Sequence, residues 1–213
     1  MEILDNELPF FKNWNLTGDP KPKRSNPHLG IKWIPPKDGY FKLNFDGAVK
    51  GNPRKAGGGG VLRDSQGKFI LAYFFDLGLQ SNNVVEAAAM FWGVKLAKDK
   101  GFTLLEVEGD SLYIISCLKG ISQPSISIED FINKTKLLAP SFESISFNHV
   151  YREGNSLADY MENLGVITRG LKVVEDPIMM HAKFFEIMKR EGLTVNSSTN
   201  EEAKFNQTCD TLL

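Results

Sequence analysis

The chain of 213 residues has few cysteines, no long apolar run and no excess of charge of either sign. Its two cysteines, Cys117 in an apolar stretch and Cys209 in a polar tail, support neither a disulfide framework nor a thiolate zinc site. No run approaches the roughly 20 apolar residues that span a bilayer. The amino-terminal MEILDNELPFF lacks the basic start of a secretory signal. We therefore expect an intracellular protein, in the nucleus or cytoplasm, that is neither secreted nor bound to a membrane.

Charge is balanced, because 25 lysines and arginines face 26 aspartates and glutamates and the sequence pI is near 6.3. Such a chain has no global field that attracts nucleic acid, so any binding to nucleic acid must be local. The hydrophobic fraction of 42% is enough for a buried core. We expect one folded domain in a monomer, with segments left over at both ends.

Composition divides the chain into four parts. Residues 1–37 carry several prolines and no periodic pattern, which is typical of an arm or linker. Residues 38–168 hold the periodic segments of a domain. In residues 169–192 the stretch PIMMHAKFFEIMKR predicts one amphipathic helix from Pro177 to Arg190. Residues 193–213 are rich in Asn, Ser, Thr and Glu and are expected to be disordered.

The periodic segments predict an α/β fold with a five-stranded mixed sheet and helices on both faces. YFKLNFD, which ends at Asp46, alternates apolar and polar residues as a strand does, and Gly101 closes a long helix. The predicted strands cover residues 40–46, 57–63, 68–78, 104–110 and 144–152, and the predicted helices cover residues 83–100, 111–119, 126–138 and 155–164.

Four acidic residues stand at the ends of these elements: Asp46, Glu86, Asp110 and Asp159. Each has an ordinary structural explanation. Asp46 with Gly47 is a common turn opener, and Glu86 has the spacing of a capping box with Asn83. Asp110 or Asp159 suits a helix amino-terminus.

Taken together, the four acids predict more than these explanations do. Asp46 and Asp110 end strands that a β-α-β crossover commonly places side by side, while Glu86 and Asp159 begin helices. Four carboxylates are thus expected at one sheet edge, where they would repel one another without a cation. Such a cluster suits Mg²⁺, which prefers oxygen ligands and retains waters. Glu106 and Glu108 lie farther from the strand end and are expected to be solvated.

The blocks FDGAVKGNPRKAGGGGV, SNNVVEAAAM, VEGDS and VYREGNSLAD, in this order, resemble the ribonuclease H family. The resemblance is closest to its plant reverse-transcriptase-like branch, found at the ends of non-LTR retroelements and in stand-alone plant proteins. It covers about residues 33 to 166. It implies the ribonuclease H-like fold and an endonuclease that hydrolyses the RNA strand of RNA·DNA hybrids.

The resemblance also implies the roles of single residues. Asp46, Glu86, Asp110 and Asp159 would hold two Mg²⁺ or Mn²⁺ ions, and Asn52, Asn82 and Asn83 would contact the RNA sugars. Ser81 would hold a DNA phosphate. Amide side chains suit this task, because they can both donate to and accept from the 2′-OH that separates RNA from DNA. For Asn82 and Asn83, helix capping is the alternative.

Two departures keep other interpretations open. The loop before the last helix of the domain lacks the family's histidine; His149 lies on the preceding strand, and Arg152 or Glu153 are alternatives for its role. Some family members also have a basic protrusion that grips the hybrid, and this chain has no Lys/Arg-rich helix in that region, which predicts weak, salt-sensitive binding. The alternatives are a catalytically inactive domain that binds nucleic acid or protein, an interaction protein working through its carboxy-terminal helix, and an exonuclease or transposase-like enzyme.

Overall fold

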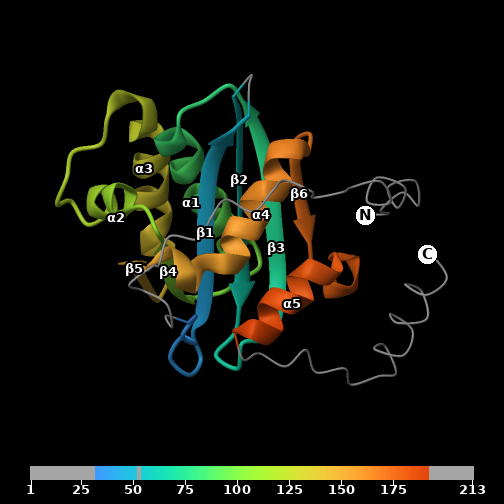
Figure 1. Cartoon of the computed structure of the whole chain (residues 1–213). Helices are drawn as coiled ribbons and strands as arrows, with labels where there is room; N and C mark the ends of the chain where they lie inside the picture. The colour runs from blue at the N-terminus through green and yellow to red at the C-terminus, as the bar shows by residue number, and fades with distance from the viewer. Residues whose placement is uncertain (1–31, 52–53, 192–213) are drawn as a thin grey trace.

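The computed structural model describes residues 32–51 and 54–191, which form a six-stranded mixed sheet between two layers of helices (Figure 1). The strands are β1 (Phe41–Lys50), β2 (Lys55–Arg63), β3 (Phe69–Gly78), β4 (Leu104–Gly109), β5 (Ser144–His149) and β6 (Leu171–Val174). The α-helices are α1 (Asn82–Asp99), α2 (Leu112–Leu118), α3 (Ile126–Leu138), α4 (Ser156–Ile167) and α5 (Ala182–Arg190), and 3₁₀ turns include η3 (Arg152–Asn155) and η4 (Pro177–Met179). The strand order is β5-β4-β1-β2-β3-β6, in which β1, β4 and β5 run parallel and the other neighbours antiparallel.

The predicted α/β fold, with a mixed sheet and helices on both faces, is confirmed, but the strand count of five is wrong. The sixth strand, β6, pairs antiparallel with β3 and lies in the segment predicted to hold only a helix. That segment also differs from one continuous helix over 177–190, because η4 ends before α5 begins at Ala182. His181 caps α5, accepting a hydrogen bond from the Lys183 N–H at 3.4 Å. The predicted disordered tail, 193–213, lies outside the described residues.

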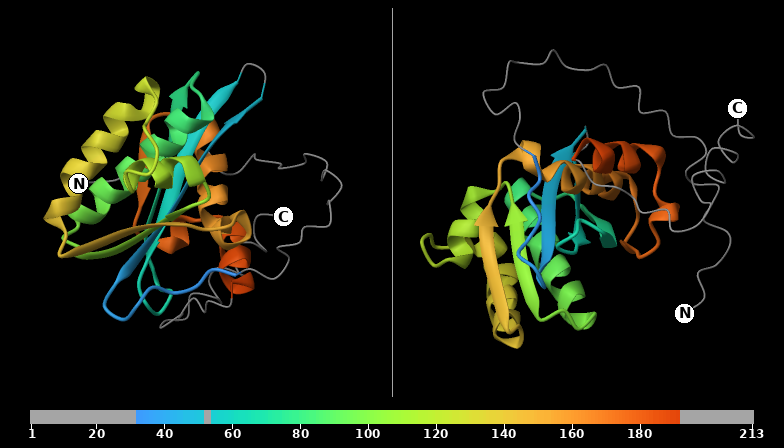
Figure 2. Two further views of the ribbon diagram at one scale, coloured as in Figure 1. Left: turned by 90° about the vertical axis from the view of Figure 1, so that its left-hand side faces the viewer. Right: turned by 90° about the horizontal axis from the view of Figure 1, so that it is seen from below.

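The molecule has two hydrophobic cores, one on each face of the sheet. Leu43 and Phe45 point into the larger core, which the sheet shares with α1, α2 and α3. The second core lies under α4 and α5 on the opposite face, where Met161 and Phe184 are fully buried (Figure 2). Because α5 places Phe184 in this core, the carboxy-terminal helix packs against the domain. Among the described residues, no helix is long and apolar enough to cross a membrane.

The β1 residues between these apolar side chains are polar yet buried. Lys42 donates to Glu108 Oε1 at 2.6 Å and lies 3.4 Å from Glu106 Oε2. The expectation that both glutamates are solvated is therefore wrong, since each retains only 15% of its side-chain exposure. A charged side chain carried to this depth is stabilised by a partner of opposite sign.

A second buried ion pair fixes the carboxy-terminal segment to the sheet. Arg63 of β2 donates to Glu191 Oε2 at 2.5 Å and to Asn44 Oδ1 at 2.9 Å. The ring of Trp33 covers the guanidinium at 3.8 Å, and its Nε1 donates to the same Asn44 oxygen. Trp33, which falls in the predicted arm, is thus part of the packed structure.

A run of glycines in β2 lets a helix approach each face of the sheet. A Cβ at Gly57 would lie 2.2 Å from the backbone nitrogen of Val166 in α4, and one at Gly59 would lie 2.7 Å from Met161 Cβ. A Cβ at Gly58 would meet Val85 and Ala89 of α1 on the other face, at 3.1 Å and 3.2 Å. The close position of α4 over β1 and β2 is therefore possible only because these residues are glycines, which have no side chain.

Replacing Gly57 with alanine should push α4 away from the sheet, because backbone atoms that cannot rotate aside occupy the space of the new methyl group. We expect a loss of about 2 kcal/mol in the free energy of unfolding, as for other overpacked sites. Chemical denaturation followed by circular dichroism measures it. An unchanged midpoint in Gly57→Ala would show that α4 does not pack this closely.

Candidate functional site

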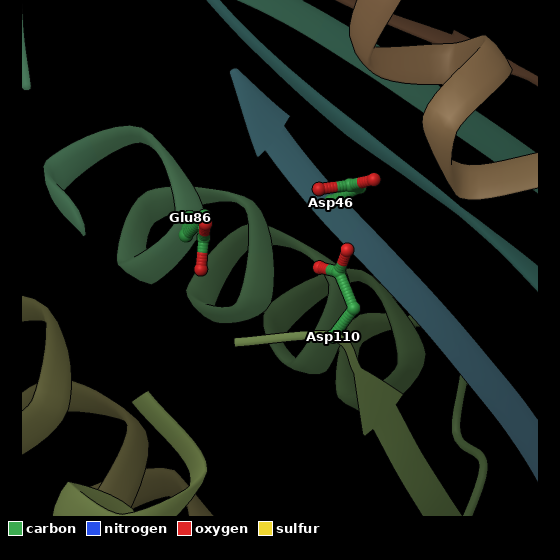
Figure 3. Close-up of side chains that lie close together, drawn as sticks. All are labelled: Asp46, Glu86 and Asp110. Carbon is green, nitrogen blue, oxygen red and sulfur yellow. The ribbon is translucent and has the colours of Figure 1, made fainter. Parts of the chain in front are cut away.

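Two of the four predicted acids are neighbours because of the sheet register. β1 and β4 pair in parallel, with Phe45 opposite Gly109, so the next residues along the two strands are Asp46 and Asp110. Gly109 has no side chain, and a Cβ there would lie 2.3 Å from the Phe45 ring. Figure 3 shows the Asp110 carboxylate pointing toward Asp46.

The third acid, Glu86, reaches the same place from α1. A Cβ on Gly47 would lie 2.6 Å from the backbone nitrogen of Glu86, so this glycine gives the helix room to approach β1. The explanation of Asp46-Gly47 as a turn opener is therefore wrong, since both residues lie within β1. The capping box is wrong as well: Ser81 caps α1, its Oγ accepting from the Val84 N–H at 3.4 Å.

These three carboxylates form one cluster. Each offers an oxygen, and the three oxygens lie within 4.8 Å of one another (Figure 3). Asp46 Oδ2 and Glu86 Oε2 are buried and have no hydrogen-bond partner among the described residues, and Asp46 Oδ1 accepts from the Gly47 N–H at 2.7 Å. Buried carboxylate oxygens without partners are costly. Oxygen ligands at this spacing fit a hard divalent cation such as Mg²⁺.

The electrostatics of the cluster show the cost of holding it without a cation. Burial, together with the charges of Asp110, Glu162 and Asp159, raises the pKa of Asp46 to about 9. Burial raises the pKa of Glu86 to about 7, against a hydrogen bond from Ser111 that lowers it. Burial also raises the pKa of Asp110, while the Arg152 guanidinium opposes that shift. Asp46 and Glu86 therefore keep their protons to higher pH than free carboxyl groups do.

Asp159 lies beside this cluster rather than in it. Its helix, α4, is fixed to β1 by Asn155, whose Nδ2 donates to the Phe45 carbonyl at 2.9 Å. Both Arg152 Nε and Nη2 donate to Asp159 Oδ1, so a guanidinium occupies one oxygen of this carboxylate. The charge of Asp159 nevertheless contributes to the raised pKa values of Asp46 and Asp110. The structure thus brings three of the four acids together and places the fourth at their edge.

Three of the four predicted nucleic-acid contacts lie near this cluster, at the start of α1. Ser81, Asn82 and Asn83 are all exposed. Ser81 caps the helix, and Asn82 Oδ1 accepts from the Val49 N–H of β1 at 3.0 Å, so Asn83 is not the helix cap. Asn52 lies outside the described residues.

Several polar residues near the cluster were not recognised from the sequence. Glu162, one turn after Asp159, is fully buried and pairs with Lys50, and its charge contributes to the raised pKa of Asp46. His149 lies in β5 as expected, opposite Gly109, and its charge partly opposes the rise in the pKa of Asp110. The i, i+3 spacing of Asp159 and Glu162 on a helix was the available signal for Glu162.

Comparison with known proteins agrees with this geometry. Residues 44–164, more than half of the chain, match the model of the reverse transcriptase-like family. The chain is 33% identical over 133 residues to an Arabidopsis thaliana protein named "Putative ribonuclease H protein", covering 62% of this chain and 22% of that protein. It is 30% identical over 132 residues to ribonuclease HI of Halobacterium salinarum, covering 61% of this chain and 65% of that protein. The chain thus spans less than two thirds of each of these relatives.

Solved structures give the same fold. The crystal structure of RNase H1 from Halobacterium salinarum superposes with a TM-score of 0.57 at 29% identity, over 60% of this chain and 98% of that one. LC11-RNase H1, solved in complex with an RNA/DNA hybrid, gives a TM-score of 0.55 at 25% identity, over 60% and 96%. The chain has the ribonuclease H fold and belongs to the reverse transcriptase-like family.

Proposed function

We propose that this protein is an endonuclease that hydrolyses the RNA strand of RNA·DNA hybrids with the help of two divalent cations, Mg²⁺ or Mn²⁺. The observation that carries the proposal is the cluster of Asp46, Glu86 and Asp110, whose oxygens lie within 4.8 Å of one another. Two of these carboxylates keep a buried oxygen without a hydrogen-bond partner among the described residues. A purely structural role would leave both oxygens unsatisfied.

The side chains divide the chemistry among them. Asp46 on β1 and Asp110, which directly follows β4, lie centrally and would hold both ions, while Glu86 comes from α1 and Asp159 from α4. When bound, the cations would lower the pKa of a water and stabilise the leaving 3′ oxygen. Arg152 holds Asp159 Oδ1, so Asp159 would act as a ligand through Oδ2 or after Arg152 releases Oδ1. A released guanidinium would then be free to pair with a substrate phosphate.

The substrate class rests on the family and on the surface beside the cluster. LC11-RNase H1, a structural neighbour, was solved with an RNA/DNA hybrid. In this chain Asn83 is exposed at the start of α1, three residues before Glu86. An exposed amide there can donate to and accept from a 2′-hydroxyl while the phosphodiester faces the carboxylates. Asn52 and Asn82 are proposed to share this role, and Ser81 to contact the DNA phosphate.

One observation favours a second candidate, a domain that binds nucleic acid without cleaving it. Asp159 is paired with Arg152, and it lies outside the group of three carboxylates. If the pair persisted in the presence of cations, Asp159 would offer only its second oxygen, Oδ2, as a ligand. The following experiment separates the two functions.

Asp110→Asn should abolish cleavage of the RNA strand in a labelled RNA·DNA hybrid. The substitution keeps the shape of the side chain and removes one central negative charge. Since cation catalysis is worth several kcal/mol of transition-state stabilisation, we expect the rate to fall about a thousandfold or more. Denaturing gel electrophoresis of the hybrid in Mg²⁺ and in Mn²⁺ measures the rate, with an all-DNA duplex as the substrate control.

Asp130→Asn is the matched control protein, because Asp130 is an exposed acid on α3 whose partner is Lys134. It should cleave at the wild-type rate. Retention of activity in Asp110→Asn would refute the assigned site. No cleavage by the folded wild type in either metal would select the non-catalytic candidate.

Cation binding should also change how stability depends on pH. The raised pKa values of Asp46 and Glu86, about 9 and about 7, lie above their ordinary values of 3.8 and 4.5. The metal-free folded protein therefore binds these protons more tightly than the unfolded chain does, and it loses that stabilisation as pH rises from about 4 to about 9. Because cations replace the protons, Mg²⁺ should raise the melting temperature more at about pH 8 than at about pH 6.

Differential scanning fluorimetry with EDTA or with Mg²⁺ measures this difference. In Asp46→Asn, which lacks one of the two central carboxylates, the increment due to Mg²⁺ should be small at both pH values. Equal increments at both pH values in the wild type would contradict the linkage between cation and protons.

A further inference from the structure

Lys50, the last residue of β1, connects the strand that carries Asp46 to the helix that carries Asp159. Its Nζ donates to Glu162 Oε1 at 2.5 Å and to Asn163 Oδ1 at 2.5 Å, both on α4. Along β1, Lys50 lies four residues after Asp46 and therefore on the same face. Along α4, Glu162 and Asn163 lie three and four residues after Asp159, one turn farther along the helix. One ammonium group thus spans both elements.

The contact with Asn163 extends to the carboxylate of Asp159. Asn163 Nδ2 donates to the Asp159 main-chain oxygen at 2.5 Å and lies 3.4 Å from Asp159 Oδ2. An asparagine amide has one accepting and one donating end. Because Lys50 can only donate, it fixes the oxygen end of Asn163 toward itself and the nitrogen end toward Asp159. The orientation of this amide therefore depends on Lys50.

The contact with Glu162 has a different consequence. The Glu162 side chain is buried, at 1% exposure, and its second oxygen, Oε2, has no hydrogen-bond partner among the described residues. Its negative charge contributes to the raised pKa values of Asp46 and Glu86. Lys50 compensates this fifth carboxylate, which would otherwise add to the repulsion among the other acids.

We propose that Lys50 is a positioning residue that orients Asp159 through Asn163 and neutralises Glu162, so that Asp159 is held ready to complete the cation site. The inference rests on the proposed function, because it assigns Asp159 a cation. Among the described residues, Lys50 pairs with Glu162 and Asn163 and with none of the proposed ligands. Its role differs from that of Lys134, which pairs with Asp130 within a single exposed helix turn. Lys50 instead contacts Glu162 and Asn163, which follow it by 112 and 113 positions in the sequence.

The test compares Lys50→Met, which retains the aliphatic stem and removes the charge, with Lys50→Arg and with the control Lys134→Met, all in the full chain. The double variant Lys50→Met/Glu162→Gln removes both members of the buried pair, so a folded protein remains available if Lys50→Met alone unfolds. Circular dichroism checks the fold of each variant.

The first measurement needs no metal. The side-chain amide resonances of Asn163 in a ¹⁵N-labelled protein, assigned by their loss in Asn163→Leu, report the hydrogen bonds of that amide. They should shift in Lys50→Met and in the double variant, return toward the wild-type position in Lys50→Arg, and stay unchanged in Lys134→Met. Unchanged resonances in the folded double variant would overturn the proposal.

The second measurement uses Mn²⁺ as the probe, titrated by isothermal calorimetry, followed by hybrid cleavage. In Lys50→Met, the weaker Mn²⁺ site should lose about tenfold in affinity, as is typical when a residue that orients a ligand is removed. The kcat should fall about tenfold while KM for the hybrid changes less than about twofold. Lys50→Arg should recover most of both losses.

The two proposals fail in different ways. Wild-type Mn²⁺ affinity and kcat in Lys50→Met would overturn the positioning role and leave the proposed nuclease intact. A folded wild type that neither binds Mn²⁺ nor cleaves the hybrid would overturn the proposed function, while the metal-free resonances would still decide whether Lys50 orients Asn163.

Discussion

Parallel hydrogen bonding between β1 and β4 places two carboxylates side by side at the centre of the site. The register that sets Phe45 opposite Gly109 brings Asp46 next to Asp110, although 64 positions separate them in the sequence. The helices can approach the sheet closely only because the facing strand residues are glycines. Gly47 leaves room for α1, which carries Glu86, and Gly57 leaves room for α4 against β2. The site is thus built by a sheet register and by missing side chains as much as by the acids themselves.

Basic side chains pair with the outer acids of the site and not with the inner ones. Arg152 pairs with Asp159 and Lys50 with Glu162, whereas Asp46 and Glu86 each keep a buried oxygen without a partner among the described residues. The innermost carboxylates are therefore the ones left without a paired protein cation, and burial together with the charges of neighbouring acids raises their pKa values. This distribution limits the repulsion at the rim and leaves the centre as the place where the proposed cations would bind.

Much of this fold follows from sequence periodicity, because local pattern and final structure agree. The alternation in β1, the limits of α3 and the glycine that closes α1 at residue 101 were all predictable. The four-residue β6 was missed since its pairing with β3 has no local signature. Three consecutive residues at 81–83 are all of capping type, so sequence could not select Ser81 as the cap. Lys50, Asn155 and Glu162 were missed because their partners lie more than a hundred positions away.

The neutral overall charge has a consequence for how the proposed substrate would bind. Without cations the ionised acids of the cluster would repel phosphate, and the chain, with 25 basic against 26 acidic residues, has no excess of positive charge to offset this repulsion. Two divalent cations would balance the four negative charges of Asp46, Glu86, Asp110 and Asp159, and Arg152, once released from Asp159, would add a positive charge near the phosphate. Affinity for the hybrid would then depend on the cations more than on a basic surface. The same ions that support the chemistry would therefore also turn a repulsive site into one that accepts a phosphodiester.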